Sequence, residues 1–365
     1  MNRLPGVDLL RILGILAVIT IHAFSYHFQN GIPRNFNSVE IIYVLVRFAV
    51  PYFFVTSGYF WGRKIVRGAD PLQTSLRFCK RILIIFIVWS LIYLLPHDLF
   101  EIYNRGFAGS FQNSIERAIF LSHHPLWIAL SGTATHLWFL PSLLICVVVC
   151  TCFLMMRQVG LLMVFSTGLY VAGVLSNAYL KTPIGFHLPF DTTRGPCLGV
   201  VLFASGYLLS TRKINPSWLW KGCLILIAGL VLQFLELIIL RGRFGIISLP
   251  DYVFGTYFLG LGCCMIAVSM GYQAEGRCQS ANINESNRTV ALKAALPWSQ
   301  LVNTIGQLTL GIYAIHLIFV ENLSHFRDFL PAFLWDVGFT PFLFILSGVV
   351  VYLMSKSRIL RPIVV

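Results

Sequence analysis

The chain has 365 residues, of which 57% are hydrophobic and 11% are charged. Soluble domains carry about 25% charged residues, and a soluble fold of this length could not bury so much apolar surface. A formal net charge of +13 would suggest nucleic acid as the partner of a soluble protein. Here the apolar excess predicts an all-α integral membrane protein, with lipid and not nucleic acid around it.

Ten segments are long and apolar enough to cross a bilayer, which takes about 20 apolar residues per helix. In chain order they cover residues 8–28, 40–62, 78–97, 136–156, 160–178, 195–211, 218–240, 252–272, 302–322 and 337–355. These segments use most of the chain. We therefore expect one transmembrane domain over residues 1–365 and no separate soluble domain.

The distribution of Lys and Arg orients the predicted helices. With the N-terminus in the cytoplasm, most of these residues fall on the inner side, including the dense cluster at 63–81. This bias follows the positive-inside rule and predicts that both termini are cytoplasmic. Three longer connections then remain: a basic inner loop near 63–77, an outer loop near 98–135 and a polar inner linker near 273–301.

Two of the predicted helices end in similar sequences. Thr56-Ser57-Gly58-Tyr59 is followed by Arg63-Lys64, and Ala204-Ser205-Gly206-Tyr207 is followed by Arg212-Lys213. Small residues let helices approach closely in membranes, and tyrosine is common at the interface. The echo is typical of a shared packing step, and it does not establish a repeat fold.

No sequence feature predicts a metal site. The nine cysteines fall mostly inside predicted helices, where they are typical of small apolar packing residues, and their spacing is not a metal pattern. The adjacent His123 and His124 are weak evidence without further ligands.

Ionisable groups inside a membrane are costly, so their positions are the strongest functional signal. The first helix carries Asp8, Arg11 and His22. At 100° per residue, Arg11 and His22 differ by about 20° around the helix and by about 16 Å along its axis. Asp8 lies on the same stripe and can pair with Arg11 at i, i+3. One stripe thus connects a predicted ion pair at the inner surface with an imidazole in the outer half of the membrane.

This stripe favours chemistry or transport across the membrane. A neutral imidazole suits general-base work near pH 7, and Arg11 with the basic cluster at 63–81 could hold an anion such as phosphate. The structural alternative is that Arg11 extends to the interface and His22 bonds a neighbouring helix.

Four further polar residues accompany the stripe. Arg47, Glu236 and His316 lie inside predicted helices, and His136 opens a helix at the outer face. Glu236 and His316 could pair with Arg47 or His22, or could simply join helices. His136 beside Trp138 is also compatible with an interfacial anchor.

Four sequence blocks are spread over nearly the whole chain. The first, residues 8–22, contains an Arg, ten residues and a His. The others are residues 47–59, the His-Leu-Trp-Phe-Leu sequence at 136–140 and the Leu-Gly-Ile-Tyr-Ala-Ile-His sequence at 310–316. Together and in this order, they resemble the acyltransferase 3 family of integral membrane acyltransferases, most closely its stand-alone members.

The resemblance implies a ten-helix bundle in the bacterial inner membrane. Such a protein takes an acyl group, often acetyl, from cytoplasmic acetyl-CoA or another acyl-CoA. It transfers that group to a hydroxyl of a surface or periplasmic glycan or lipid-linked saccharide. By similarity, His22 would be catalytic, either as a general base or as the carrier of a transient acyl group, and Arg11 would be the arginine of the spaced pair.

The family also has an Arg-x-x-Arg pair at the inner entrance to the third helix. Here that segment offers Arg77, Lys80 and Arg81, so the spacing departs from the family pattern. These three residues and Arg11 would bind the phosphates of CoA. Arg47, Glu236, His316 and His136 would orient the acceptor or stabilise developing charge, with no metal involved.

Two rival functions are compatible with the sequence. The first is a secondary transporter or lipid-linked glycan flippase, with His22 and Glu236 as a proton relay. Inverted repeats typical of many transporters are not evident beyond the faint echo described above. The second is a non-catalytic membrane sensor or assembly subunit, which would not need a deep histidine aligned with an inner arginine.

Overall fold

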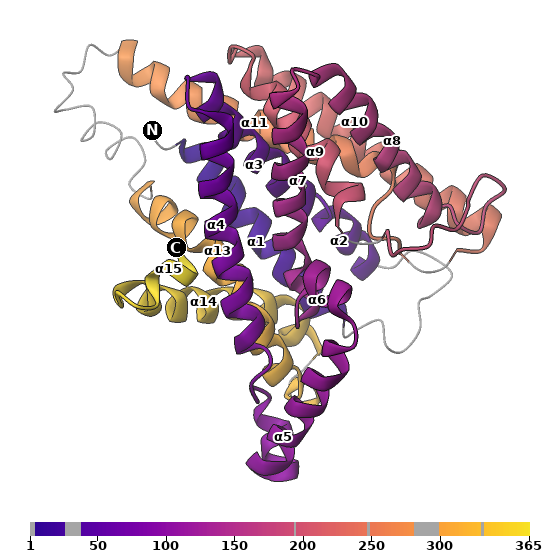
Figure 1. Ribbon diagram of the computed structural model, residues 1–365, viewed down its shortest axis with the longest axis vertical. Coiled ribbons are helices and arrows are strands. Elements are labelled where there is room, and N and C mark those ends of the chain that lie inside the picture. Colours follow the sequence, from indigo (N-terminus) through magenta and orange to yellow (C-terminus); the bar gives the residue numbers. More distant parts are fainter. Residues whose placement is uncertain (1–3, 26–37, 193–194, 247–248, 281–298, 330–331) are drawn as a thin grey trace.

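The computed structural model describes residues 4–25, 38–192, 195–246, 249–280, 299–329 and 332–365. Within these ranges every regular element is helical (Figure 1). The α-helices are α1 Pro5–Ser25, α2 Ser38–Val46, α3 Ala49–Val66, α4 Pro71–Ile92, α5 Leu99–Ser122, α6 Pro125–Ser131, α7 Phe139–Met155, α8 Val159–Ser176, α9 Pro196–Ser210, α10 Ser217–Phe244, α11 Phe254–Ser280, α13 Ser299–Ser324, α14 Ala332–Lys356 and α15 Arg361–Val364. Two short 3-10 helices, η2 Thr135–Trp138 and η3 Arg327–Phe329, complete the set.

The predicted all-α membrane fold is confirmed. In the described part of the chain, eight helical segments have the length and apolarity needed to cross a membrane. The other two predicted spans correspond to α4 and α9. α4 is 22 residues long but carries Arg77, Lys80 and Arg81 in its first half, and α9 has 15 residues. Both lie alongside α7 in the bundle (Figure 1).

The predicted helix at 40–62 is divided into α2 and α3 at Arg47 and Phe48. Pro51 explains the break, because proline has no N–H to donate to the carbonyl of residue 47 and its ring clashes with that carbonyl. The regular pattern resumes at Tyr52, whose N–H lies 2.9 Å from the carbonyl oxygen of Phe48.

The predicted outer loop at 98–135 is largely helical. Asp98 accepts hydrogen bonds from the N–H groups of Phe100 and Glu101 and so caps the start of α5. α5 bends at Gly106, whose φ of 71° lies in the left-handed region. Figure 1 shows α5 projecting from one end of the bundle. At the inner linker, α11 continues to Ser280, and residues 281–298 lie outside the described residues.

The repeated sequences at the ends of α3 and α9 mark a close helix contact. A Cβ on Gly58 would lie 2.0 Å from the carbonyl oxygen of Phe203, and a Cβ on Gly206 would lie 2.0 Å from that of Val55. The two contacts are reciprocal, since each glycine faces the backbone of the other helix. Glycine is required at both positions, and the predicted small-residue packing step is confirmed.

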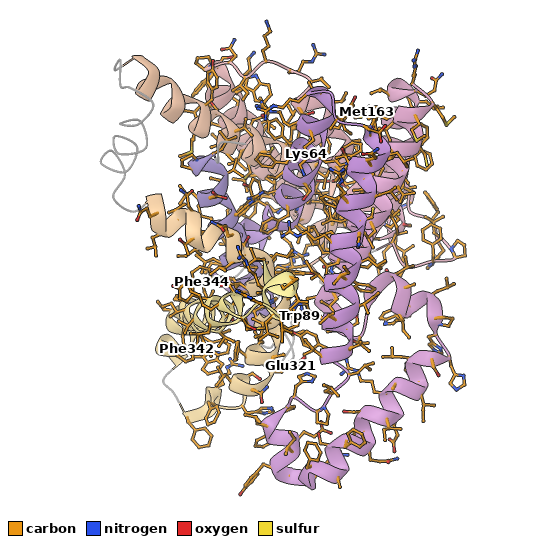
Figure 2. All side chains as sticks on the ribbon, turned by 60° about the vertical axis from the view of Figure 1, so that its left-hand side comes forward. Lys64, Trp89, Met163, Glu321, Phe342 and Phe344 are labelled. Atoms are coloured by element: carbon orange, nitrogen blue, oxygen red, sulfur yellow. The ribbon has the colours of Figure 1, made fainter. Side chains whose placement is uncertain are left out.

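α1 lies in the interior of the bundle, where it packs against α3, α11 and α13. Figure 2 shows Lys64 toward one end of the bundle and Glu321 toward the other, with Trp89 between them. Trp89 donates a hydrogen bond from Nε1 to the carbonyl oxygen of Ile363 and thereby fixes α15 against α4. The polar stripe of α1 therefore faces neighbouring helices.

Candidate active site

The N-terminal half of α1 holds the predicted ion pair. Nη1 of Arg11 lies 3.1 Å from Oδ1 of the buried Asp8, which confirms the i, i+3 pairing. Gly306 of α13 packs against Asp8 so closely that a Cβ there would lie 2.8 Å from the Cβ of Asp8. The guanidinium of Arg11 also lies 5.3 Å from the centre of the Phe60 ring, within cation–π range. Arg11 is thus positioned by an acid on its own helix and a ring on α3.

A cavity of about 430 Å³ runs beside α1, with walls from α1, α3, α4, α7 and α13. Arg11 and Arg81 are its cationic lining residues, whereas Phe139 and Tyr313 line the part nearer the outer end of their helices. Val18 also lines it, seven residues after Arg11, so the cavity extends about 10 Å along α1. The cavity is charged at one end and aromatic at the other.

Three histidines converge beyond the aromatic end of this cavity. The ring of His22 lies 5.2 Å from that of His316 and 6.1 Å from that of His136, measured between centroids. His136 and His316 are 5.2 Å apart. They come from α1, α13 and η2, and His22 follows Val18 by about one helical turn. His136 and His316 are buried, and His22 is partly exposed.

The hydrogen bonds of the two buried histidines determine their tautomers. Nδ1 of His316 lies 2.7 Å from the carbonyl oxygen of Tyr313, and Nε2 of His136 lies 3.2 Å from that of Ala314. Because a carbonyl only accepts, each of these ring nitrogens carries the hydrogen in the neutral imidazole. The opposite nitrogens, Nε2 of His316 and Nδ1 of His136, are buried without a partner among the described residues. In the neutral forms, each of these two nitrogens therefore keeps a lone pair without a described partner inside the histidine cluster.

Two tyrosines that the sequence analysis did not select hold His136 in place. The rings of Tyr93 and Tyr313 lie 5.1 and 5.3 Å from that of His136. Tyr93 donates its hydroxyl to the carbonyl oxygen of Ala314 at 2.8 Å, and Tyr313 donates to the carbonyl oxygen of His136. Tyr313 could have been found from its i, i+3 spacing to His316, whereas no sequence pattern pointed to Tyr93.

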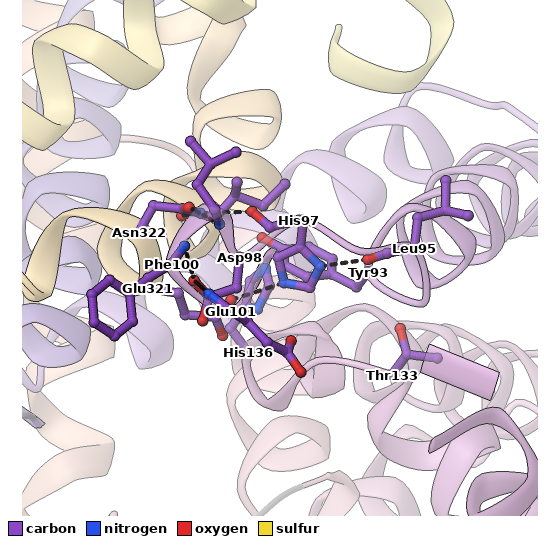
Figure 3. Close-up of polar contacts among 12 residues, drawn as sticks. Tyr93, Leu95, His97, Asp98, Phe100, Glu101, Thr133, His136, Glu321 and Asn322 are labelled. Atoms are coloured by element: carbon purple, nitrogen blue, oxygen red, sulfur yellow. Dashed lines mark hydrogen bonds and ion pairs between the residues drawn. The ribbon is translucent and has the colours of Figure 1, made fainter. Parts of the chain in front are cut away.

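A polar network ties the outer end of α13 to the segment between α4 and α5 (Figure 3). Nε2 of His97 lies 2.9 Å from Oε2 of Glu321. Asn322 donates to the carbonyl oxygen of His97 and accepts from the N–H of Leu99. Burial alone would lower the pKa of His97, but hydrogen bonds to Glu321 and to the carbonyl of Leu95 raise it overall. The network holds α13, and with it His316, against α4.

The predicted phosphate-binding residues of α4 separate into two groups. Arg81 lines the cavity and donates a hydrogen bond to the backbone oxygen of Val365. Arg77 and Lys80 are exposed and are not among the cavity-lining residues. Arg77 instead lies 3.5 Å from the side-chain oxygen of Gln73.

Arg47 and Glu236 have partners elsewhere. Nη1 of Arg47 lies 2.9 Å from Oδ1 of Asp251, an acid that the sequence analysis did not select. Glu236 accepts hydrogen bonds from the hydroxyl of Tyr179 and the N–H of Gly255, and so caps the start of α11. Both residues join helices to connecting segments, and neither contacts the histidines in these interactions.

Comparison with known proteins identifies the family of the chain. A family model described as an acyltransferase domain matches residues 4–356. The chain is 29% identical over 182 residues to an amino-acid racemase of Enterococcus faecalis, covering 49% of this chain and 23% of that protein. It is 24% identical over 249 residues to a serine/alanine racemase of Enterococcus gallinarum, covering 65% of this chain and 33% of that protein.

The chain thus spans about a quarter to a third of the length of these curated relatives. No solved structure matches the chain. The family match, by contrast, extends over nearly all of its residues. The chain belongs to the acyltransferase 3 family of membrane acyltransferases.

Proposed function

We propose that the protein is an O-acyltransferase of the bacterial inner membrane that takes an acetyl group from cytoplasmic acetyl-CoA. It transfers the group to a hydroxyl of a cell-surface or periplasmic glycan, or of a lipid-linked saccharide. The observation that carries this proposal is the alignment of a cationic cavity mouth, a cavity beside α1 and three histidines.

The donor enters from the cationic end. Coenzyme A is a polyanion with a long uncharged thiol arm, so its phosphates stay near Arg11 and Arg81 while the arm follows the cavity along α1. The apolar walls suit the arm and exclude phosphate. The thioester then lies toward His22, about 16 Å from Arg11 along the helix.

His22 acts as the general base. Its imidazole takes the proton from the acceptor hydroxyl as the hydroxyl oxygen attacks the thioester carbonyl carbon. The C–S bond breaks when the tetrahedral intermediate collapses, and the proton passes from His22 to the departing sulfur. The products are the acyl ester and the free thiol of CoA. Of the three histidines His22 alone is partly exposed, which suits direct contact with an acceptor.

His316 and His136 orient the acceptor. Each directs its N–H to a backbone carbonyl, so in the neutral form the opposite ring nitrogen keeps a lone pair, and the two rings lie within 6.1 Å of that of His22. A lone pair accepts a hydrogen bond from a hydroxyl and cannot stabilise an oxyanion. Of the two roles expected from the sequence, the tautomers favour orientation of the hydroxyl. Arg47 and Glu236 serve instead as helix-joining residues.

The proposal can be tested with purified protein in detergent. Acetyl-CoA binding and the release of its thiol, with water as the acceptor, are measured for wild type, Arg11→Ala and His22→Ala. Arg11→Ala should weaken binding, and His22→Ala should lower thiol release by about 10²- to 10⁴-fold while binding persists. The exposed His123 provides a matched control, His123→Ala, which should behave as wild type.

Absence of any affinity of the wild-type protein for acyl-CoA would overturn the enzyme assignment. Proton-coupled flux of a saccharide or another solute in proteoliposomes would then test the transporter alternative. In that case His22→Ala should abolish flux.

A further inference from the structure

A second and larger cavity lies at the inner ends of α3 and α9. It measures about 840 Å³, and its walls include the C-terminal turns of both helices and Leu4 before α1. Four cations line it, namely Arg63, Arg67, Arg212 and Lys213. Its aromatic walls are Tyr59, Phe60 and Tyr272.

The close packing of α3 and α9 creates this concentration of charge. The reciprocal contacts of Gly58 and Gly206 hold the helices side by side near their inner ends. Each helix ends with basic residues a few positions later, as the repeated sequences require. The cations of both helices are therefore brought around one cavity, which neither helix could form alone.

No acidic residue is among the described lining of this cavity. Arg63 donates a hydrogen bond to the hydroxyl of the buried Tyr59 at 3.1 Å. Arg67, Arg212 and Lys213 form no ion pair with a described carboxylate. Several cations around one space, without neutralising acids, favour a ligand that carries several negative charges.

This second cavity, called the basic cavity below, adjoins the 430 Å³ cavity beside α1, called the reaction cavity, at one contact. Phe60 lines the basic cavity, and the guanidinium over its ring belongs to Arg11, which lines the reaction cavity. Ser57, one turn before Phe60 along α3, also lines the reaction cavity. A ligand that passes this contact could place one end in each cavity.

We propose that the basic cavity binds the nucleotide end of acyl-CoA, with its 3′-phosphate and adenine, while the thiol arm occupies the reaction cavity. This inference rests on the proposed function. Arginine binds phosphate with two parallel hydrogen bonds. Arg212 and Lys213, in the segment that follows α9, supply two of the positive charges around the cavity. The aromatic walls offer a stacking surface for the base. An anionic phospholipid headgroup shares the phosphate chemistry, but it has neither the purine nor the arm that leads toward His22.

The test compares ligands that contain different parts of acyl-CoA. The double variant Arg212→Ala/Lys213→Ala is the main perturbation, and Lys64→Ala is its matched control. Lys64 is an exposed cation next to Arg63 that lines neither cavity. Binding of acetyl-CoA and adenosine 3′,5′-bisphosphate is measured by calorimetry, and thiol release is measured from acetyl-CoA and from acetyl-pantetheine, which lacks the nucleotide.

The double variant should bind acetyl-CoA and the bisphosphate about 10- to 100-fold more weakly, since hydrogen bonds to charged groups are lost. Its thiol release from acetyl-pantetheine should stay within about twofold of wild type, because the reaction cavity is intact. That retained activity also shows that the variant is folded. Lys64→Ala should match wild type for every ligand.

Unchanged affinity of the double variant for both nucleotides would overturn the proposal. A further experiment tests whether the cavity binds an anionic phospholipid instead. It uses the protein in nanodiscs of phosphatidylglycerol or phosphatidylcholine. If the double variant retains less phosphatidylglycerol than wild type in native mass spectra, while its affinity for acetyl-CoA is unchanged, the cavity binds lipid instead. If wild type neither binds acetyl-CoA nor releases thiol from either donor, the proposed function itself fails, a result distinct from both.

Discussion

Replacing His316 with leucine separates a role in the reaction from a role in folding. The variant loses the bond from Nδ1 to the carbonyl oxygen of Tyr313, at a cost of about 0.5–1.5 kcal/mol. It also removes Nε2, which is buried without a described partner. In wild type, burial of this unsatisfied nitrogen destabilises the folded state by about 1–3 kcal/mol. The free energy of unfolding should therefore stay the same or rise.

The turnover of His316→Leu should fall, although its stability should not. If the lone pair of His316 orients the attacking hydroxyl, its removal should cost about 1–3 kcal/mol of transition-state stabilisation. This corresponds to a fall of about 5- to 150-fold in thiol release from acetyl-CoA. Affinity for acetyl-CoA should not change, because His316 lies beyond the described lining of both cavities.

The assay pairs thermal unfolding in detergent with thiol release at saturating acetyl-CoA, for His316→Leu and the exposed control His123→Leu. The expected pattern is lower turnover with an unfolding midpoint equal to or above that of wild type. A midpoint lowered by more than about 5 °C, together with lost activity, would indicate a structural role. Unchanged turnover would refute the orienting role.

Three further outcomes follow from the structure. Arg11→Lys should weaken acetyl-CoA binding about tenfold in calorimetry, because lysine cannot reproduce the planar guanidinium; equal affinity would contradict a phosphate contact. Gly206→Ala should lower stability by about 1–3 kcal/mol or more, because its Cβ would lie 2.0 Å from a backbone oxygen of α3. Gly168→Ala, with nothing within 4 Å of the added carbon, should be neutral or stabilising in the same unfolding assay. The raised pKa of His97 gives stability that is fully present below about pH 6.5 and is lost as pH rises through the folded-state pKa. Glu321→Gln should therefore lower the midpoint near pH 6 and have progressively less effect toward about pH 9; a pH-independent difference would exclude this linkage.

Periodicity along one helix predicted the part of the site that lies on that helix. Asp8 and Arg11 pair as their spacing requires, because the geometry of an α-helix fixes relations between residues three or four apart. Relations between helices are not contained in that pattern. Glu236 and His316 were equally plausible partners of His22 from sequence, and the structure places His316 beside it and Glu236 at the start of α11.

Helix boundaries differ from those predicted from apolar runs where a proline or a capping residue determines the local backbone. The pattern at 40–62 predicts one continuous helix. Residues 40–66 do form one candidate membrane span, but Pro51 interrupts the helix at Arg47 and Phe48. The reverse holds for α5, which is too polar for a predicted span but has a capping aspartate, Asp98, at its start. An aspartate followed three residues later by Glu101 is a helix-start signal that a search for membrane spans does not weigh.

The buried lone pairs are the feature furthest from prediction by sequence. They depend on carbonyls of α13, those of Tyr313 and Ala314, at the position where the rings of His316 and His136 meet. No pattern of residue types specifies which ring nitrogen contacts a carbonyl. The resemblance of the block at 310–316 to the family predicted that His316 belongs to the site. The tautomers of His316 and His136 follow only from their hydrogen bonds in the structure.

The spacing of eleven residues between Arg11 and His22 joins the two halves of the proposed reaction. A polyanion cannot enter the apolar part of the cavity without large desolvation, so its charged end must stop at the arginines. The base must then lie on the same face of α1 and one arm length further outward. Eleven residues keep the two side chains within about 20° of each other, whereas ten or twelve would turn His22 by about 100° away from His316. In the proposed reaction, the spacing in α1 thus sets both the reach of the donor and the direction of the base, and the other helices supply the cavity walls and the two lone pairs.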